Sequence, residues 1–377
     1  MPGTSIHMSR DKDETFMSLA LRQAKKAVGM TSPNPLVGAV LVKRGRVIGK
    51  GHHKRAGLPH AEIEAFLDAE RGGSGVSGST MYVTLEPCCH TGKRTPPCVN
   101  AVIDKKISRV VVGALDPNPK VSGFGVELLR ASGIEVETHV LEERCRGMNE
   151  DYNKFIVSGV PFVTLKLAAT LDGRIAAGSG DSKWIGSEAQ RRRAHGLRRR
   201  ADAVVVGIGT VLTDNPRLTA RLGGGVARQP FPVVLDSRLR IPLDAELIRA
   251  HDAPVVATTA RGAKARKLKR LQDAGVRVLT LESDEEGRPR WDNLLYELGR
   301  MGAMNVLVEG GGGVAASALR ARAVDKLVWF YAPKIVGGDG LGMVGALGIE
   351  SIGDSIHVKD IKITRFGDEF MVEGYLS

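Results

Sequence analysis

Two short segments of the chain combine residue types that bind metal. The segment LEPCCHTGKRTPPC (Leu85–Cys98) holds three of the four cysteines, and PHAEIEA (Pro59–Ala65) adds a histidine upstream. A catalytic zinc ion uses three protein ligands and keeps the fourth position for water. His60, Cys88 and Cys98 supply that number. Each follows a proline where a helix is expected to begin, and the positive end of a helix lowers the pKa of a thiol.

Glu62 lies two residues after His60 and is expected on the same helical turn. A carboxylate there can take a proton from metal-bound water and pass it to a leaving amine. The pattern His-x-Glu followed by Pro-Cys is typical of zinc nucleobase deaminases. The chain departs from that pattern because nine residues separate Cys88 from Cys98, where the editing deaminases have two. The residues therefore predict hydrolytic deamination of an amidine-like carbon.

Two other interpretations of the cysteines stay open at this point. Cys88 and Cys98 could form a disulfide, although four cysteines in 377 residues indicate a reducing, cytoplasmic setting. A structural zinc site could use Cys89 and His90, but adjacent side chains rarely converge on one metal, and Glu62 would then have no role.

Polar residues near these segments are candidates for substrate contacts. Asn34, in the turn SPNP, could bind a pyrimidine edge through its carboxamide, or it could simply form an Asx turn. One of His52 and His53, which follow a strand, is expected to line the pocket.

The first half alternates strands and helices, which predicts a compact α/β layer. A loose N-terminal tail is expected before a helix that starts near Asp13, and Arg44-Gly45 is expected to be a tight turn between two strands. A polar helix ends at Ser158-Gly159, before Pro161, which places a domain boundary there. The predicted domains are residues 1–159 and 160–377.

The second half predicts an open, mostly parallel sheet, closed by two strands around Gly367-Asp368. VLVEGGGGVAASAL (Val306–Leu319) is an apolar strand that runs through four glycines into a helix. Backbone amides at such a helix start can bind phosphate. A dinucleotide fold of the Rossmann type is not predicted, because no ribose-binding acid stands at the right distance.

The net charge of +12 suits either nucleic acid or a phosphorylated ligand. The run QRRRAHGLRRR (Gln190–Arg200) has no interleaved aromatic residues for base stacking, so nucleic-acid binding is not expected. No apolar run is long enough to cross a membrane.

A series of motifs runs through both halves in order. The first half has TSPNPLVGAV, GHHKRAGLPHAE, TGKRTPPC and ALDPNP, and the second has LKLAATLDGRIA, GDSKWIGS, VGIGTVLTDNPRLTAR, VLDSRLRIP, VEGGG and YAPKIVGG. Together they resemble the bifunctional riboflavin-biosynthesis deaminase/reductase family over nearly the whole chain. The resemblance implies a cytidine-deaminase-like zinc domain, followed by a dihydrofolate-reductase-like domain that uses NADPH. The implied substrate is a diaminopyrimidinone with a phosphoribosylamino group, which is deaminated and then reduced to the ribityl form.

The resemblance also implies roles for residues of the second half. The positions expected to hold the cofactor are Ala168, Trp184, Thr210, Asp214, Ser237, Gly311, Gly312, Gly313, Val314, Ala315, Ala316 and Ser317. The positions expected to hold the substrate are Ser182, Arg198, Leu218, Arg221 and Glu309, together with Asn34 in the first half. Lys166 and Glu309 are candidates for the proton transfer that opens the sugar ring.

The family resemblance further implies a homo-oligomer, a dimer or a tetramer. Two alternatives are a nucleic-acid-editing deaminase with an appended binding domain, and a deaminase whose second domain has lost catalysis. The wide cysteine spacing opposes the first, and the intact glycine-rich loop opposes the second.

Overall fold

The computed structural model describes residues 3–90, 96–222 and 228–376. Lys93 and Arg94, whose roles the sequence leaves open, lie outside these ranges. The chain divides into two compact units, Met1–Gly159 and Val160–Ser377. Each unit is described by itself.

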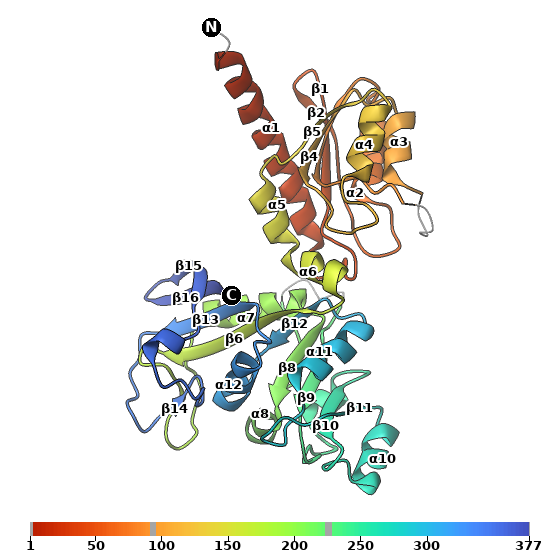
Figure 1. Ribbon diagram of the computed structural model, residues 1–377. Coiled ribbons are helices and arrows are strands. Elements are labelled where there is room, and N and C mark those ends of the chain that lie inside the picture. Colours follow the sequence, from red (N-terminus) through yellow and green to blue (C-terminus); the bar gives the residue numbers. More distant parts are fainter. Residues whose placement is uncertain (1–2, 91–95, 223–227, 377) are drawn as a thin grey trace. The chain divides into compact units, whose positions relative to one another are not determined.

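The first unit is a five-stranded sheet in the order β2-β1-β3-β4-β5. Figure 1 shows helices on both sides of this sheet. β1 is antiparallel to β2 and β3, whereas β3, β4 and β5 are parallel. The strands are β1 (Gly38–Lys43), β2 (Arg46–His52), β3 (Thr80–Leu85), β4 (Arg109–Ala114) and β5 (Glu135–Glu137). The helices are α1 (Gly3–Ala24), the short 3-10 helix η1 (Lys25–Ala27), α2 (Ala61–Arg71), α3 (Cys98–Asp104), α4 (Phe124–Ala131), α5 (Glu142–Met148) and α6 (Glu150–Ser158).

Apolar residues cover both faces of this sheet. Phe66 of α2, Val102 of α3 and Leu129 of α4 pack on one face, and Met17 of α1 with Cys145 of α5 packs on the other. The expected turn at Arg44-Gly45 is confirmed, with positive φ angles of 50° and 73°.

The prediction of a loose N-terminal tail is wrong, because α1 already begins at Gly3. No proline or glycine stands between Gly3 and Gly29, so nothing in the sequence interrupts a helix there. Asp13 also fixes the helix to the sheet, since Arg109 donates to both of its carboxylate oxygens at 2.9 Å.

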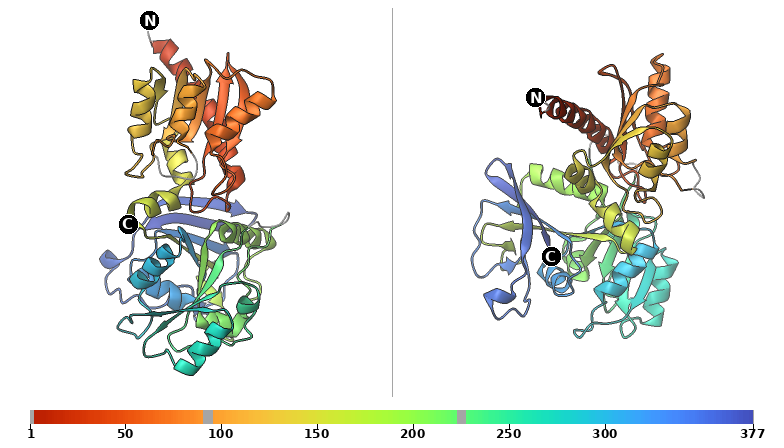
Figure 2. Two further views of the ribbon diagram at one scale, coloured as in Figure 1. Left: turned by 90° about the vertical axis from the view of Figure 1, so that its right-hand side faces the viewer. Right: turned by 45° about the horizontal axis from the view of Figure 1, so that its top comes forward.

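The second unit has a separate two-stranded sheet of β14 and β7, and a nine-stranded sheet in the order β11-β10-β9-β8-β12-β6-β13-β16-β15. The nine-stranded sheet is parallel from β11 to β13, and β16 and β15 continue it antiparallel, so the predicted mostly parallel sheet is confirmed. Figure 2 shows this final hairpin, in dark blue, at the outer end of the sheet. The strands are β6 (Phe162–Thr170), β7 (Arg174–Ala176), β8 (Ala203–Gly207), β9 (Phe231–Leu235), β10 (Val255–Thr259), β11 (Arg277–Leu281), β12 (Asn305–Val308), β13 (Lys326–Ala332), β14 (Leu341–Gly342), β15 (Val358–Phe366) and β16 (Glu369–Leu376).

Helices cover both faces of the second sheet. α11 and α12 contribute Leu294, Leu298 and Ala315 to one core, while α8 and α10 contribute Val211 and Leu271 to the other. The helices are α7 (Glu188–Arg200), α8 (Ile208–Asp214), α9 (Glu246–Arg249), α10 (Ala265–Asp273), α11 (Trp291–Arg300) and α12 (Gly312–Arg320), with a 3-10 turn η2 (Ile352–Asp354).

Close packing of α2 on β2 generates a first prediction. A Cβ atom at Gly51 would lie 2.2 Å from the Ala61 carbonyl oxygen and 2.4 Å from the Ala65 nitrogen. We expect Gly51→Ala to destabilise the first unit by about 1–3 kcal/mol, because α2 must move away from the sheet. Calorimetry should show a lower unfolding midpoint. Gly75→Ala is the control, since a Cβ there meets nothing within 4 Å. An equal midpoint in both variants would contradict the prediction.

Candidate metal centre and cofactor site

The three predicted zinc ligands meet where two helices begin. His60 is the residue before α2, Cys98 is the first residue of α3, and Cys88 lies on the loop that follows β3. The Nδ1 atom of His60 lies 3.1 Å from the Cys98 sulfur and 3.6 Å from the Cys88 sulfur. The ligand atoms of all three residues lie within 4.8 Å of one another. One nitrogen and two sulfurs at this spacing fit a zinc ion with an open fourth position.

The two thiols share a polar, buried environment. A hydrogen bond with Cys98 lowers the pKa of the Cys88 thiol, and His60 lowers it further. Cys88 is therefore the thiol that ionises first, and Cys98 holds its proton longer because the same hydrogen bond raises its pKa. All four cysteines are free thiols, so the disulfide interpretation is wrong for this structure.

Glu62 faces the same site from the first turn of α2, and only 3% of its surface is exposed. Burial raises the pKa of this carboxyl, and the charge of Cys88 raises it further. A carboxylate with a raised pKa is a stronger base than an ordinary one and accepts a proton more readily. Its position is therefore suited to carrying protons beside the metal.

A cavity of about 520 Å³ opens onto His60, Glu62 and Cys88. Asn34 lies in its wall, where the Asn34 Nδ2 atom is 3.0 Å from His53 Nε2. His53 Nδ1 donates to the Pro59 carbonyl at 3.1 Å, which leaves Nε2 as the acceptor for Asn34. Of the two neighbouring histidines, His53 is thus the one that lines the cavity, as the sequence suggested for one of them.

The sequence analysis missed Glu86, which also lines this cavity and is 3% exposed. Its carboxylate accepts backbone N–H groups from Asp116 at 3.2 Å, Gly123 at 3.0 Å and Val126 at 3.1 Å. These bonds join the end of β3 to the loop after β4 and to the start of α4. Asp116 in turn accepts from the Tyr152 hydroxyl at 3.0 Å. The only sequence signal was an acidic residue at the end of an apolar strand.

A second cavity, of about 770 Å³, lies in the second unit at the start of α12. The predicted cofactor residues that line it are Thr210, Ser237, Gly311, Gly312, Gly313, Val314 and Ser317. The N–H groups at the start of α12 favour a phosphate there. A Cβ atom at Gly312 would lie 2.6 Å from the Gly342 carbonyl oxygen, so glycine is required for this close approach.

Five other predicted cofactor residues are not part of the cavity wall. Ala315 and Ala316 are buried in α12, and Ala168 lies on β6 opposite Phe330. Asp214 ends α8 on the surface, and Trp184 is 66% exposed. The Arg191 guanidinium stacks over the Trp184 ring at 4.7 Å, which gives that ring a contact without a cofactor.

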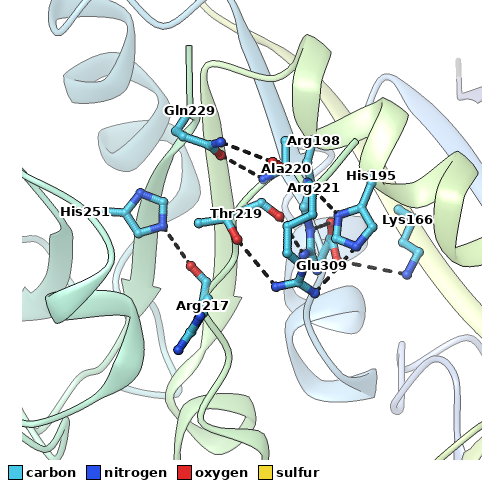
Figure 3. Close-up of polar contacts among 10 residues, drawn as sticks. All are labelled: Lys166, His195, Arg198, Arg217, Thr219, Ala220, Arg221, Gln229, His251 and Glu309. Atoms are coloured by element: carbon cyan, nitrogen blue, oxygen red, sulfur yellow. Dashed lines mark hydrogen bonds and ion pairs between the residues drawn. The ribbon is translucent and has the colours of Figure 1, made fainter. Parts of the chain in front are cut away.

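Three predicted substrate residues and the candidate proton carrier Lys166 come together beside β12 (Figure 3). Glu309 follows β12, and Arg198 of α7 donates to both of its carboxylate oxygens at 2.7 and 2.8 Å. The Lys166 ammonium lies 4.0 Å from Glu309. Although burial opposes ionisation, Arg198 and Lys166 lower the pKa of Glu309 to about 2. Arg221 lies near Arg198, since both arginines contact Thr219.

The other two residues of the second unit that were predicted to bind the substrate, Leu218 and Ser182, do not belong to this cluster. Leu218 is buried, at 2% exposure, with a positive φ of 55°, and it contributes to the core rather than to an open site. Ser182 lies two residues before Trp184, in a stretch without regular secondary structure.

Comparisons with known proteins agree with this architecture. Residues 10–114 match the cytidine and deoxycytidylate deaminase zinc-binding region, and residues 161–372 match the RibD C-terminal domain. The riboflavin biosynthesis protein RibD of Aquifex aeolicus is 45% identical, over 97% of this chain and 99% of its own length. The RibD protein of Escherichia coli is 36% identical, over 95% and 98%.

Solved structures give the same result for the whole chain. The Thermotoga maritima diaminohydroxyphosphoribosylaminopyrimidine deaminase/5-amino-6-(5-phosphoribosylamino)uracil reductase is 37% identical with a TM-score of 0.85, covering 98% of this chain and 100% of that one. Acinetobacter baumannii RibD is 34% identical with a TM-score of 0.85, covering 98% and 99%.

The fold and sites are therefore those of a zinc deaminase followed by a pyridine-nucleotide reductase. The chain belongs to the RibD family of bifunctional riboflavin biosynthesis enzymes. It deaminates the phosphoribosylaminopyrimidine with zinc and reduces the ribosyl side chain with NADPH, in a cytidine-deaminase-like and a dihydrofolate-reductase-like domain. The nucleic-acid-editing alternative is not favoured. Within the described residues, no helix is both long and apolar enough to span a membrane.

The contacts of Glu86 generate a prediction about the deaminase cavity. Glu86→Gln should place an amide N–H₂ against backbone donors, costing about 1–3 kcal/mol in unfolding free energy. Amide hydrogen exchange at Asp116, Gly123 and Val126 should become faster. Glu127→Gln, in the exposed first turn of α4, is the control and should leave this exchange unchanged. Unchanged protection of those amides in Glu86→Gln would rule out the role of the carboxylate.

Proposed function

We propose that His60, Cys88 and Cys98 hold the zinc ion and that Glu62 is the catalytic proton carrier of the deaminase. The observation that carries this assignment is the cluster of three ligand atoms within 4.8 Å beside a carboxyl that is 3% exposed. Asn34, held by His53, would bind the edge of the pyrimidine through its carboxamide. Residues 1–159 would form the deaminase and 160–377 the reductase, a division supported by the two compact units.

When bound, zinc activates a water molecule and NADPH supplies a hydride. Glu62 takes the proton that the water loses and gives it to the amine, which leaves as ammonia. The raised pKa of Glu62 suits the first half of this exchange, because it makes the carboxylate a stronger base toward the water proton. Its burial excludes bulk water that would compete for the proton.

The second cavity supports the assignment of cofactor-binding residues in the reductase. Backbone N–H groups of Gly312 and Gly313, at the start of α12, would hold the cofactor phosphates, with Thr210 and Ser237 as hydroxyl partners. Arg221 and Arg198 would face the phosphate of the substrate, and Glu309 would orient Arg198. By the family pattern, the substrate would also meet Ser182 and Leu218, and the cofactor would also meet Ala168, Trp184 and Asp214.

Lys166 is the proposed proton donor for ring opening. The bond between the anomeric carbon and the ring oxygen breaks, the oxygen takes the Lys166 proton, and the nitrogen lone pair forms a C=N bond that then accepts the hydride. Burial, and then Arg198, lower the pKa of Lys166, while Glu309 opposes them. A lowered pKa makes the ammonium a stronger acid than an ordinary lysine.

We further propose a cytoplasmic homo-oligomer, a dimer or a tetramer, that acts on a small phosphorylated pyrimidine and not on nucleic acid. The four free thiols support the compartment. β15 supports self-association because it is an outer strand of its sheet, with Ile361 and Ile363 exposed at 59% and 62%.

Substitution of Glu62 tests the deaminase assignment. Glu62→Gln should lower the deamination rate by about 10²–10⁴-fold, because the amide carries no proton between water and amine. Mass spectrometry should still show reduction of supplied deaminated substrate with NADPH, and bound zinc should be retained. The control is Glu64→Gln, two residues further along α2, where the carboxylate pairs with Lys54 at 2.8 Å. Normal deamination by Glu62→Gln would contradict the assignment.

Substitution of Lys166 tests the reductase assignment. Because the charged form donates the proton, the reductase rate should fall as pH rises through the lowered pKa of Lys166. Lys166→Met should lower the rate by about 10²–10⁴-fold and abolish this pH limb, with deamination unchanged. Lys359→Met, on the exposed strand β15, is the control. A Lys166→Met enzyme that keeps the alkaline limb would show that another group is the donor.

A further inference from the structure

His195 is a half-buried residue of the second unit to which neither the motifs nor the family pattern assigned a role. It lies on α7 one turn before Arg198, so both side chains are on the same face of the helix. That face lies against residues 217–221, the segment that carries Arg221 (Figure 3). The contacts of the imidazole with this segment indicate its role.

The segment 217–221 is held at several backbone atoms. The His251 Nε2 atom donates to the Arg217 carbonyl at 2.7 Å. The Gln229 carboxamide bonds both the N–H and the carbonyl of Ala220, at 2.8 and 3.1 Å. Arg198 donates to the Thr219 carbonyl at 3.2 Å. The path of the backbone is therefore fixed up to Ala220, and Arg221 is the next residue.

His195 makes the next contact with this segment, at Arg221. The Arg221 backbone N–H donates to His195 Nδ1 at 3.3 Å, and the Arg221 Nη2 atom lies 3.5 Å from His195 Nε2. A backbone amide can only donate, so Nδ1 accepts and carries no proton, which leaves the ring proton on Nε2. The Nε2–H and the Arg221 guanidinium are then both donors, so the contact at Nε2 is not a hydrogen bond and the ring holds Arg221 through its backbone N–H alone. Protonation of Nδ1 would place two N–H donors against each other.

The surroundings of the ring favour this neutral state. Arg198 from α7 and Arg221 from the segment are cations that disfavour a second positive charge, as does burial. Glu309 after β12 and the Thr219 carbonyl act in the opposite direction, and Lys166 of β6 adds a further cation beside Glu309. Burial first, and then the two arginines, lower the pKa of His195.

We propose that His195 is a positioning residue for the reductase, which accepts the Arg221 N–H and so directs the Arg221 guanidinium toward the phosphate of the substrate. The proposal rests on the placement of the substrate phosphate at Arg198 and Arg221 given above. The ring itself adds no charge to the site. Its effect is on substrate binding, through Arg221, and not on the hydride or proton transfer.

The test uses the full-length enzyme with deaminated substrate that has or lacks the phosphate. His195→Leu should raise the KM of the phosphorylated substrate about tenfold, the value for one lost hydrogen bond, with kcat changed less than about twofold. The KM of the dephosphorylated substrate should not change. His195→Gln should restore most of the affinity, because its carboxamide oxygen can accept the Arg221 N–H. Arg192→Gln, on the exposed side of α7, is the control.

A pH series gives a second readout that loss of folding cannot imitate. As pH falls, protonation of His195 should raise the wild-type KM, whereas His195→Gln has no group to protonate. The substrate phosphate also titrates near pH 6, so the ratio of the two KM values is the quantity to compare. A ratio that stays constant with pH would overturn the proposal, as would an equal KM increase for both substrates.

Arg221→Gln separates this proposal from the substrate assignment. If Arg221→Gln leaves the preference for phosphorylated substrate intact, the substrate placement is wrong and the role of His195 falls with it. If Arg221→Gln removes that preference but His195→Leu does not, the placement stands and only the role of His195 is overturned. Deaminase activity, measured on the same samples, confirms that each variant is folded in its first unit.

Discussion

Both sites depend on the way parallel strands end at one edge of a sheet. In the first unit, β3 and β4 are parallel and their last paired residues are Leu85 and Ala114. The chain after β3 carries Cys88, and the chain after β4 carries Asp116, so both turn over the same edge. In the second unit, β12 lies between β6 and β8, and Glu309 follows its last pair. Residues that are remote in sequence meet there because the register of the parallel strands brings the ends of these strands to the same edge.

Carboxylates placed at these edges are buried, and a buried charge is tolerated only when it is paired or hydrogen-bonded. The structure meets this need in two ways. Backbone N–H groups bind Glu86 and also Asp236, which is 0% exposed and accepts the Ile241 N–H at 2.8 Å, whereas a bidentate arginine binds Glu309. Glu62 has different surroundings, because burial and the charge of Cys88 raise its pKa whereas His60 lowers it. Three carboxylates therefore hold backbone or side chains in place, and the fourth faces the proposed zinc ligands.

The sequence predicted the parts of each site that have a local signature. His60, Cys88 and Cys98 were recognisable because metal chemistry restricts residue type, and the Gly311–Ser317 loop because helix starts bind phosphate. Contacts between distant segments left no such signal. Glu86 reaches its partners across β4, and His195 meets Arg221 only because α7 packs beside the segment after α8. The start of α1 was misjudged because polar composition suggested a tail, whereas the buried Asp13–Arg109 pair fixes the helix to the sheet.

The two proposed sites, which act one after the other on a phosphorylated substrate, differ in their balance of charged groups. In the deaminase cavity the proposed zinc ligands and Glu62 would concentrate negative charge, which a bound zinc ion would offset. Around Glu309 the balance is different, since Arg198, Arg221 and Lys166 face a single carboxylate. Two positive charges are left over, and a phosphate carries about the matching negative charge at neutral pH. A neutral His195 preserves that match, because a third uncompensated cation would repel Arg221 from the direction that its backbone contact sets.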